Sequence, residues 1–308
     1  MTTRAVREHE FLVSGTSRIR LACTETGTGS APVKVVYLHG LIASSTFWKP
    51  LVDVAVDRFA DRVDHIRIDA RGHGRSAWPH PRATNDIAAL ADDLAVVFDT
   101  VATSPVVAVA HSIGGYVLLE YARRHRDQFH RHIRAVLLFN AAGERPWWPG
   151  LRPFRVAAAP IRPLRRTRGD AVNAWAHRVM QQRMIAMSGR AKPGRSQLVP
   201  DQLPVDPRVT ADICSAAEVF RIDQAVLAAL SRVPVRVVGA EFDAVVPPEQ
   251  SRHLAQRIPG ARLDIVARTG HSLPYAHPQI AAGFVEEALE TIPSTFSARP
   301  SDTAGAPC

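Results

Sequence analysis

A serine lies where the sequence changes abruptly from an apolar, strand-like run to a helical pattern. Residues 106–110 are continuously apolar, as in a buried strand, and they run into the turn HSIGG at 111–115, after which a helical pattern begins. Small residues two before and two after Ser112, namely Ala110 and Gly114, allow a strand and a helix to pass closely. Such a turn exposes a hydroxyl beside helix N–H groups, so Ser112 is a candidate nucleophile.

A serine hydroxyl needs a base, and the sequence offers an acid and a base in a fitting order. The apolar run 235–239 leads to Asp243, and the run 263–266 leads to His271 in the segment TGHS. Each residue comes just after a predicted strand, as Ser112 does. Glu241 is a competing carboxylate in the same loop as Asp243, but the small residue and the Val-Val-Pro that follow Asp243 favour the aspartate.

Together with the His39-Gly40 turn and the block DARGHGRS at 69–76, these motifs resemble the α/β-hydrolase superfamily from His39 to about Glu287. The resemblance implies that Ser112 is the nucleophile, that His271 is the general base and acid, and that Asp243 orients the imidazole. It also implies an oxyanion hole made by the backbone N–H groups of Leu41 and Ile113. The block at 69–76 is interpreted as structural, with Asp69 or Arg71 ordering neighbouring loops and His73 a less favoured site residue.

Strand patterns alternate with helical ones up to residue 140, which predicts an α/β-hydrolase fold with a mostly parallel central sheet flanked by helices. The alternation stops over 141–232, which we interpret as a mainly helical cap inserted into the core. The core is then formed by 1–140 and 233–292, and 293–308 is expected to be a disordered tail. Candidate substrate-pocket residues are His39, Trp147, Trp148 and Trp175.

Composition limits the other function classes. The net charge of +9 comes mainly from arginine, yet no basic helix with base-reading residues is evident, so no nucleic-acid partner is expected. The first residues lack a secretory pattern and no stretch is long enough for a membrane helix, so the protein is expected to be cytoplasmic. The three cysteines, Cys23, Cys214 and Cys308, lack metal-binding spacing, and no metal or other cofactor is expected.

The favoured reaction is cleavage of a small-molecule carboxylic ester through an acyl-enzyme on Ser112. Lactonase, thioesterase, carbon–carbon bond hydrolase, acyltransferase and cofactor-free haloperoxidase activities use the same residues and stay open. A serine at position 112 argues against epoxide hydrolase and haloalkane dehalogenase chemistry, which need a carboxylate there. A non-catalytic ligand-binding protein of the same fold is the alternative from a different class. The sequence does not indicate an oligomeric state.

Overall fold

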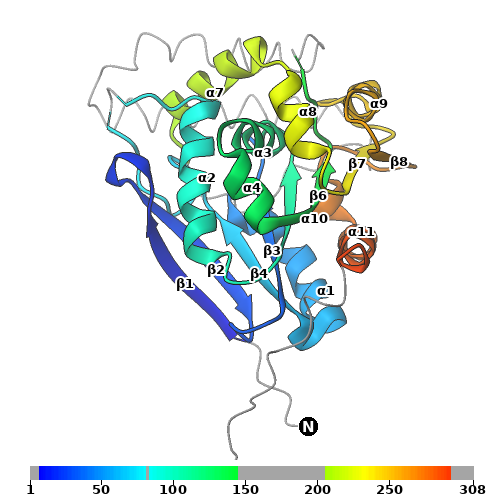
Figure 1. The fold of residues 1–308 in the computed structure, drawn as a ribbon, viewed down its shortest axis with the longest axis horizontal. Helices are drawn as coiled ribbons and strands as arrows, with labels where there is room; N and C mark the ends of the chain where they lie inside the picture. The colour runs from blue at the N-terminus through cyan, green and yellow to red at the C-terminus, as the bar shows by residue number, and fades with distance from the viewer. Residues whose placement is uncertain (1–6, 81–82, 145–204, 293–308) are drawn as a thin grey trace, which may run out of the picture.

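The computed structural model describes residues 7–80, 83–144 and 205–292, which form an eight-stranded sheet with helices on both faces (Figure 1). The strands are β1 (Arg7–Ser14), β2 (Arg20–Gly27), β3 (Val33–Leu38), β4 (Val63–Ile68), β5 (Val106–His111), β6 (Ile133–Phe139), β7 (Val235–Ala240) and β8 (Arg262–Val266). The α-helices are α1 (Lys49–Phe59), α2 (Ile87–Val101), α3 (Ile113–Arg124), α4 (Arg126–His132), α7 (Pro207–Val219), α8 (Gln224–Leu230), α9 (Pro248–Arg257), α10 (Leu273–Ala276) and α11 (Pro278–Glu290). Short 3-10 helices are η1 (Thr16–Arg18), η2 (Ser45–Trp48) and η3 (Ala60–Arg62).

The strand order is β1-β2-β4-β3-β5-β6-β7-β8. The strands from β4 to β8 along this order are parallel, whereas β1 and β2 form an antiparallel hairpin at one edge. The predicted fold class and the mostly parallel sheet are therefore confirmed. Parallel strands place their carboxyl ends at one edge of the sheet, where ligands bind in open α/β sheets. The loops after β3, β5, β6, β7 and β8 meet at that edge.

Helices cover the two faces of the sheet with two separate apolar cores. One core joins the sheet to α2, α3, α7 and α8, and the other joins it to α1 and α11 (Figure 1). Strand β5 is buried at all six positions because it lies inside the sheet with helices on both sides, which explains its unbroken apolar sequence. In the described ranges, no helix has the length and apolar character needed to cross a membrane.

The predicted cap at 141–232 is described only at its two ends, 141–144 and 205–232. Helix α7 begins after Asp206, whose side chain accepts a hydrogen bond from the Arg208 N–H at 2.9 Å, and Pro207 occupies its first turn. Helix α8 packs on α3 and α4. The other cap residues, and the predicted tail at 293–308, lie outside the described residues.

The block at 69–76 follows β4 and ties the hairpin, the sheet and α2 together. Asp69 accepts hydrogen bonds from the N–H groups of Ser45 (2.6 Å) and Arg75 (3.1 Å). Arg71 forms a two-pronged ion pair with Asp93 of α2, with N–O distances of 2.6 and 2.7 Å. Asp93 also accepts the N–H and the hydroxyl of Thr16 in η1. These contacts agree with the structural role predicted for the block.

We expect Asp93→Ala to reduce the free energy of unfolding by about 3–5 kcal/mol, because it leaves the Arg71 guanidinium buried without its partner. The exposed fractions of the two side chains are only 3% and 6%. Asp53→Ala is the matched control, since it removes an ion pair with Lys49 whose side chains are 56% and 58% exposed, and should cost less than about 0.5 kcal/mol. Urea denaturation measures both, and equal losses would contradict this interpretation.

Candidate active site

Ser112 lies between β5 and α3 with a backbone conformation of φ 54° and ψ −122°. Few residues other than glycine adopt this region, and the strain is held by two hydrogen bonds. The Ser112 N–H donates to the Phe139 carbonyl at 3.0 Å, and the Ser112 carbonyl accepts from the Gly115 N–H at 2.9 Å. The predicted sharp turn between strand and helix is thus present, and Ala110 fits into it fully buried.

Glycine is required at position 114 by the closeness of two backbones. A Cβ added there would lie 2.7 Å from the Leu38 carbonyl oxygen and 2.8 Å from that of His39. The start of α3 therefore lies directly on the end of β3. This approach brings the residues that follow β3, including Leu41, beside the first turn of α3, which carries Ile113.

Asp243 follows β7, and its carboxylate receives four N–H donors. One oxygen, Oδ1, accepts from the backbone of Val245 (2.8 Å) and Val246 (2.7 Å). The other, Oδ2, accepts from Asn140 Nδ2 and His271 Nδ1, both at 2.8 Å. Four donors fill the acceptor sites of an ionised carboxylate, and the side chain is fully buried.

The competing carboxylate, Glu241, faces away from His271. It is exposed, and its Oε2 accepts a hydrogen bond from the Arg268 N–H at 2.7 Å. The structure therefore pairs His271 with Asp243, as the sequence favoured.

Asn140 is a site residue that the sequence analysis missed. It follows β6 with a positive φ of 48°, donates its backbone N–H to the Val238 carbonyl at 2.7 Å, and directs its side-chain amide at Asp243. The available signal was a lone polar residue directly after a buried strand, of a type that tolerates positive φ.

The ring of His111, the residue before Ser112, packs against the ring of His271. The ring centroids of His111 and His271 are 4.7 Å apart, and His111 Nε2 donates to the His271 carbonyl at 2.8 Å. Burial is the main reason that the pKa of His111 lies well below its ordinary value, so this ring is neutral. His111 thus holds the backbone of the His271 loop. Within the described residues, no hydrogen bond joins the Ser112 hydroxyl to His271.

The two predicted oxyanion donors lie on the elements that Gly114 brings together. In the part of the chain that the structure describes, neither the Leu41 N–H nor the Ile113 N–H donates to another protein group. Both residues are 7% exposed. Both N–H groups therefore lack an acceptor among the described residues, and they lie on neighbouring elements.

His39 fixes the peptide group that carries the Leu41 N–H. The Ala70 N–H donates to His39 Nε2 at 3.1 Å, so the proton of the neutral ring is on Nδ1, which donates to the Gly40 carbonyl at 2.8 Å. Burial is the largest cause that lowers the pKa of His39 to about 3. His39 was predicted to line the substrate pocket. In the structure both its ring nitrogens are bound to the backbone.

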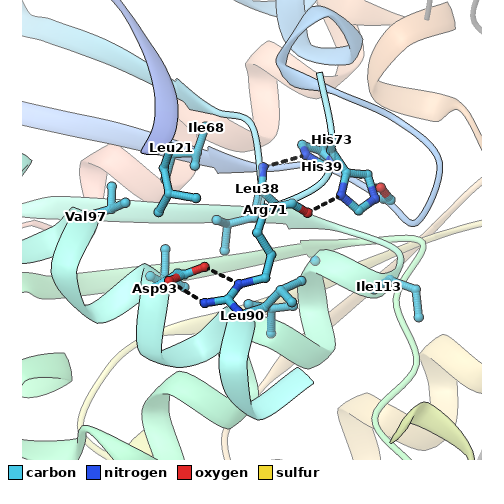
Figure 2. Close-up of a pocket in the computed structure, with 15 residues that line it drawn as sticks. Leu21, Leu38, His39, Ile68, Arg71, His73, Leu90, Asp93, Val97 and Ile113 are labelled. Carbon is cyan, nitrogen blue, oxygen red and sulfur yellow. Dashed lines mark hydrogen bonds and ion pairs between the residues drawn. The ribbon is translucent and has the colours of Figure 1, made fainter. Parts of the chain in front are cut away.

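A small apolar cavity of about 40 Å³ lies behind this loop, between the sheet, α2 and α3 (Figure 2). Figure 2 shows the Arg71–Asp93 ion pair on its wall and His39 and His73 at one end. Gly40 and Ile113 line it, but neither Ser112 nor His271 does. The cavity therefore adjoins the loop after β3 and the start of α3 and does not include the candidate nucleophile.

The three tryptophans predicted to line the pocket, Trp147, Trp148 and Trp175, lie outside the described residues. Among the residues with described positions, no group of three or more His, Cys, Asp or Glu side chains is arranged to hold a metal ion. Cys23 and Cys214 are buried and form no disulfide.

The strain at Ser112 can be measured by exchanging its side chain. We expect Ser112→Gly to unfold with a free energy about 1 kcal/mol higher than Ser112→Ala, because glycine adopts a positive φ without strain. Ser231 is the matched control: it is exposed at the end of α8 with φ −61°, so glycine there should be no more stable than alanine. If glycine were more stable than alanine by the same amount at positions 112 and 231, the backbone at Ser112 would not be strained.

Comparison with known proteins agrees with this architecture. A sequence profile of the Alpha/beta hydrolase family matches residues 35–283. The solved structure of a thermophilic esterase from Thermogutta terrifontis superposes with a TM-score of 0.70 at 23% identity, covering 94% of this chain and 100% of that one.

Two curated relatives are similar in sequence. The pimeloyl-[acyl-carrier protein] methyl ester esterase of Neisseria meningitidis (strain MC58) is 27% identical over 262 residues, 84% of this chain and 93% of that protein. The probable oxidoreductase EphD of Mycobacterium tuberculosis (strain H37Rv) is 27% identical over 315 residues, 92% of this chain but 50% of that protein. The chain thus spans about half the length of the second relative. With a family profile matching most of its length, the chain belongs to the Alpha/beta hydrolase family.

Proposed function

We propose that the protein is a serine hydrolase that cleaves a carboxylic ester of a small molecule through an acyl-enzyme on Ser112. The observation that carries the proposal is the hydrogen-bonded pair of His271 and Asp243, at 2.8 Å, beside a serine held in a strained turn. The similarity to a methyl ester esterase supports an ester as the substrate class.

In the proposed first half-reaction, Ser112 Oγ attacks the ester carbonyl carbon while its proton passes to His271 Nε2. The carbonyl oxygen gains negative charge and accepts hydrogen bonds from the Leu41 and Ile113 N–H groups. When the tetrahedral intermediate collapses, the bond to the alcohol oxygen breaks and His271 returns the proton to that oxygen. Water then attacks the acyl-enzyme by the same steps and releases the acid and free Ser112.

Asp243 keeps His271 in the tautomer that this mechanism needs. Because its Oδ2 accepts from Nδ1, the neutral ring has its lone pair on Nε2, which can take the serine proton. Asn140 and the two backbone donors hold the carboxylate in place, so Asp243 stays oriented whether or not His271 is charged.

Labelling with a fluorophosphonate tests the proposal directly. We expect one covalent adduct by intact mass on the native protein and none on Ser112→Ala, because only an activated serine reacts. Hydrolysis of a panel of esters, lactones and thioesters then identifies the bond that is cleaved. Absence of an adduct on a protein shown by circular dichroism to be folded would contradict the proposed function and favour a ligand-binding role.

The role of Asn140 predicts a shift in pH dependence. We expect Asn140→Asp to move the acid limb of kcat/KM to higher pH, because a second negative charge beside Asp243 stabilises the protonated form of His271. The neutral variant Asn140→Ala is the matched control: it should lower kcat by up to about tenfold with a much smaller shift of the limb. If the acid limbs of the two variants coincide, Asn140 does not act on the charge of this pair.

A further inference from the structure

His73 lies in the loop after β4 and is 1% exposed, yet both its ring nitrogens contact backbone carbonyl oxygens. Its Nε2 is 2.6 Å from the Leu41 oxygen, and its Nδ1 is 2.9 Å from the Arg71 oxygen. A carbonyl oxygen only accepts and a neutral imidazole has a single N–H, so the ring donates one of these two bonds. The shorter contact assigns the N–H to Nε2, which donates to the Leu41 oxygen. The Nε2 bond joins His73 to the loop that carries the predicted oxyanion donor.

The bond to Leu41 complements the one made by His39. Each amino acid lies between two peptide groups, and those that flank the Leu41 Cα are held by different histidines. His39 donates to the Gly40 oxygen, on the peptide that carries the Leu41 N–H, and His73 donates to the Leu41 oxygen, on the next peptide. The two rings lie 5.0 Å apart, between centroids. Both peptide planes beside Leu41 are therefore held by histidine side chains, one from the same loop and one from the loop after β4.

His73 is itself held by the segment that leads into α7. His73 pairs with Val205 in an isolated antiparallel bridge, and the Asp206 N–H donates to the Gly72 oxygen at 2.6 Å. Gly72 has φ 69°, and a Cβ there would lie 2.6 Å from the Val209 side chain. The pKa of His73 lies below its ordinary value, because burial outweighs the two carbonyl oxygens and the carboxylates of Asp69 and Asp206, which raise it, so the ring is neutral.

We propose that His73 is a positioning residue of the oxyanion hole, which holds the Leu41 peptide through its Nε2 and connects that peptide to the start of α7. This inference rests on the proposed function, because it assigns His73 a part in the same reaction. A residue needed only for folding would affect the reaction through either ring contact. The proposal instead predicts that only the contact of Nε2 with the Leu41 oxygen matters for the rate of hydrolysis.

The two nitrogens can be tested separately with amide side chains. In His73→Gln the amide nitrogen takes the place of Nε2 and can still donate to the Leu41 oxygen. In His73→Asn it takes the place of Nδ1 and can donate only to the Arg71 oxygen. We expect His73→Asn to lower kcat for a short p-nitrophenyl ester by about 10- to 100-fold with KM little changed, since an oxyanion donor acts in the transition state. His73→Gln should stay within about threefold of the native protein.

Three results would overturn the proposal: equal losses in the two variants, a loss confined to His73→Gln, or no loss in either. Thermal unfolding of both variants controls for folding, and the more active variant need not be the more stable one. Crystal structures of the variants add a readout that does not depend on activity: the Leu41 carbonyl should keep its orientation in His73→Gln and change it in His73→Asn. If the native protein hydrolyses no ester and forms no fluorophosphonate adduct, the proposed function is contradicted. The positioning of Leu41 by His73 is then still tested by comparing the Leu41 carbonyl orientation in the crystal structures of the two variants.

Discussion

The site depends on one close approach of two backbones, where the start of α3 lies against the carbonyl groups at the end of β3. Only glycine fits at position 114, where a Cβ would come within 2.8 Å of two carbonyl oxygens. The parallel pairing of β3 with β5 sets these two strand ends side by side. The loop with Leu41 and the helix start with Ile113 are then neighbours, and each carries an N–H group that has no acceptor among the residues the structure describes. Without the contact at Gly114, the loop after β3 would not lie beside the turn that carries Ser112.

Hydrogen bonds between buried polar groups fix the positions of the loops at the carboxyl ends of the strands. Burying a polar group is costly unless it is hydrogen-bonded, so each one limits the positions of its partners. Asp243 has four N–H donors, His39 has a partner at each nitrogen, and Arg71 has a carboxylate. These bonds tie together the loops after β6, β7 and β8, and they also join the loop after β3 to the loop after β4. The geometry around Ser112 is therefore set by several loops that each need the others to satisfy their polar groups.

Histidine has several separate uses at this edge. His39 and His73 donate to the backbone of the loop after β3, His111 donates to the backbone of the His271 loop, and His271 bonds Asp243. The sequence does not distinguish a histidine that bonds the backbone from one that bonds a carboxylate, because each of them is simply a histidine near the end of a strand. The ring contacts separate them: only His271 among these four bonds a carboxylate, while the other three bond the backbone.

Local signals in the sequence were sufficient for the fold class and for naming candidate site residues. The continuous apolar runs of β3, β5 and β6 indicated strands buried on both faces, and the small residues around Ser112 indicated a tight turn, because such steric demands are local. Asn140 could not be assigned, since its partner Asp243 is 103 residues away and the contact exists only when β6 and β7 pair. The same limit applied to His73 and His39.

The sequence by itself thus determined the strands, the turn at Ser112 and the chemical types available at the carboxyl ends of the strands. Only the tertiary structure decided which carboxylate meets His271, which nitrogen of His39 carries the proton, and which N–H groups lack an acceptor among the described residues. The reason is physical: chain geometry and side-chain volume act between near neighbours in sequence. Hydrogen bonds between buried groups act between loops that become neighbours only after the sheet has formed.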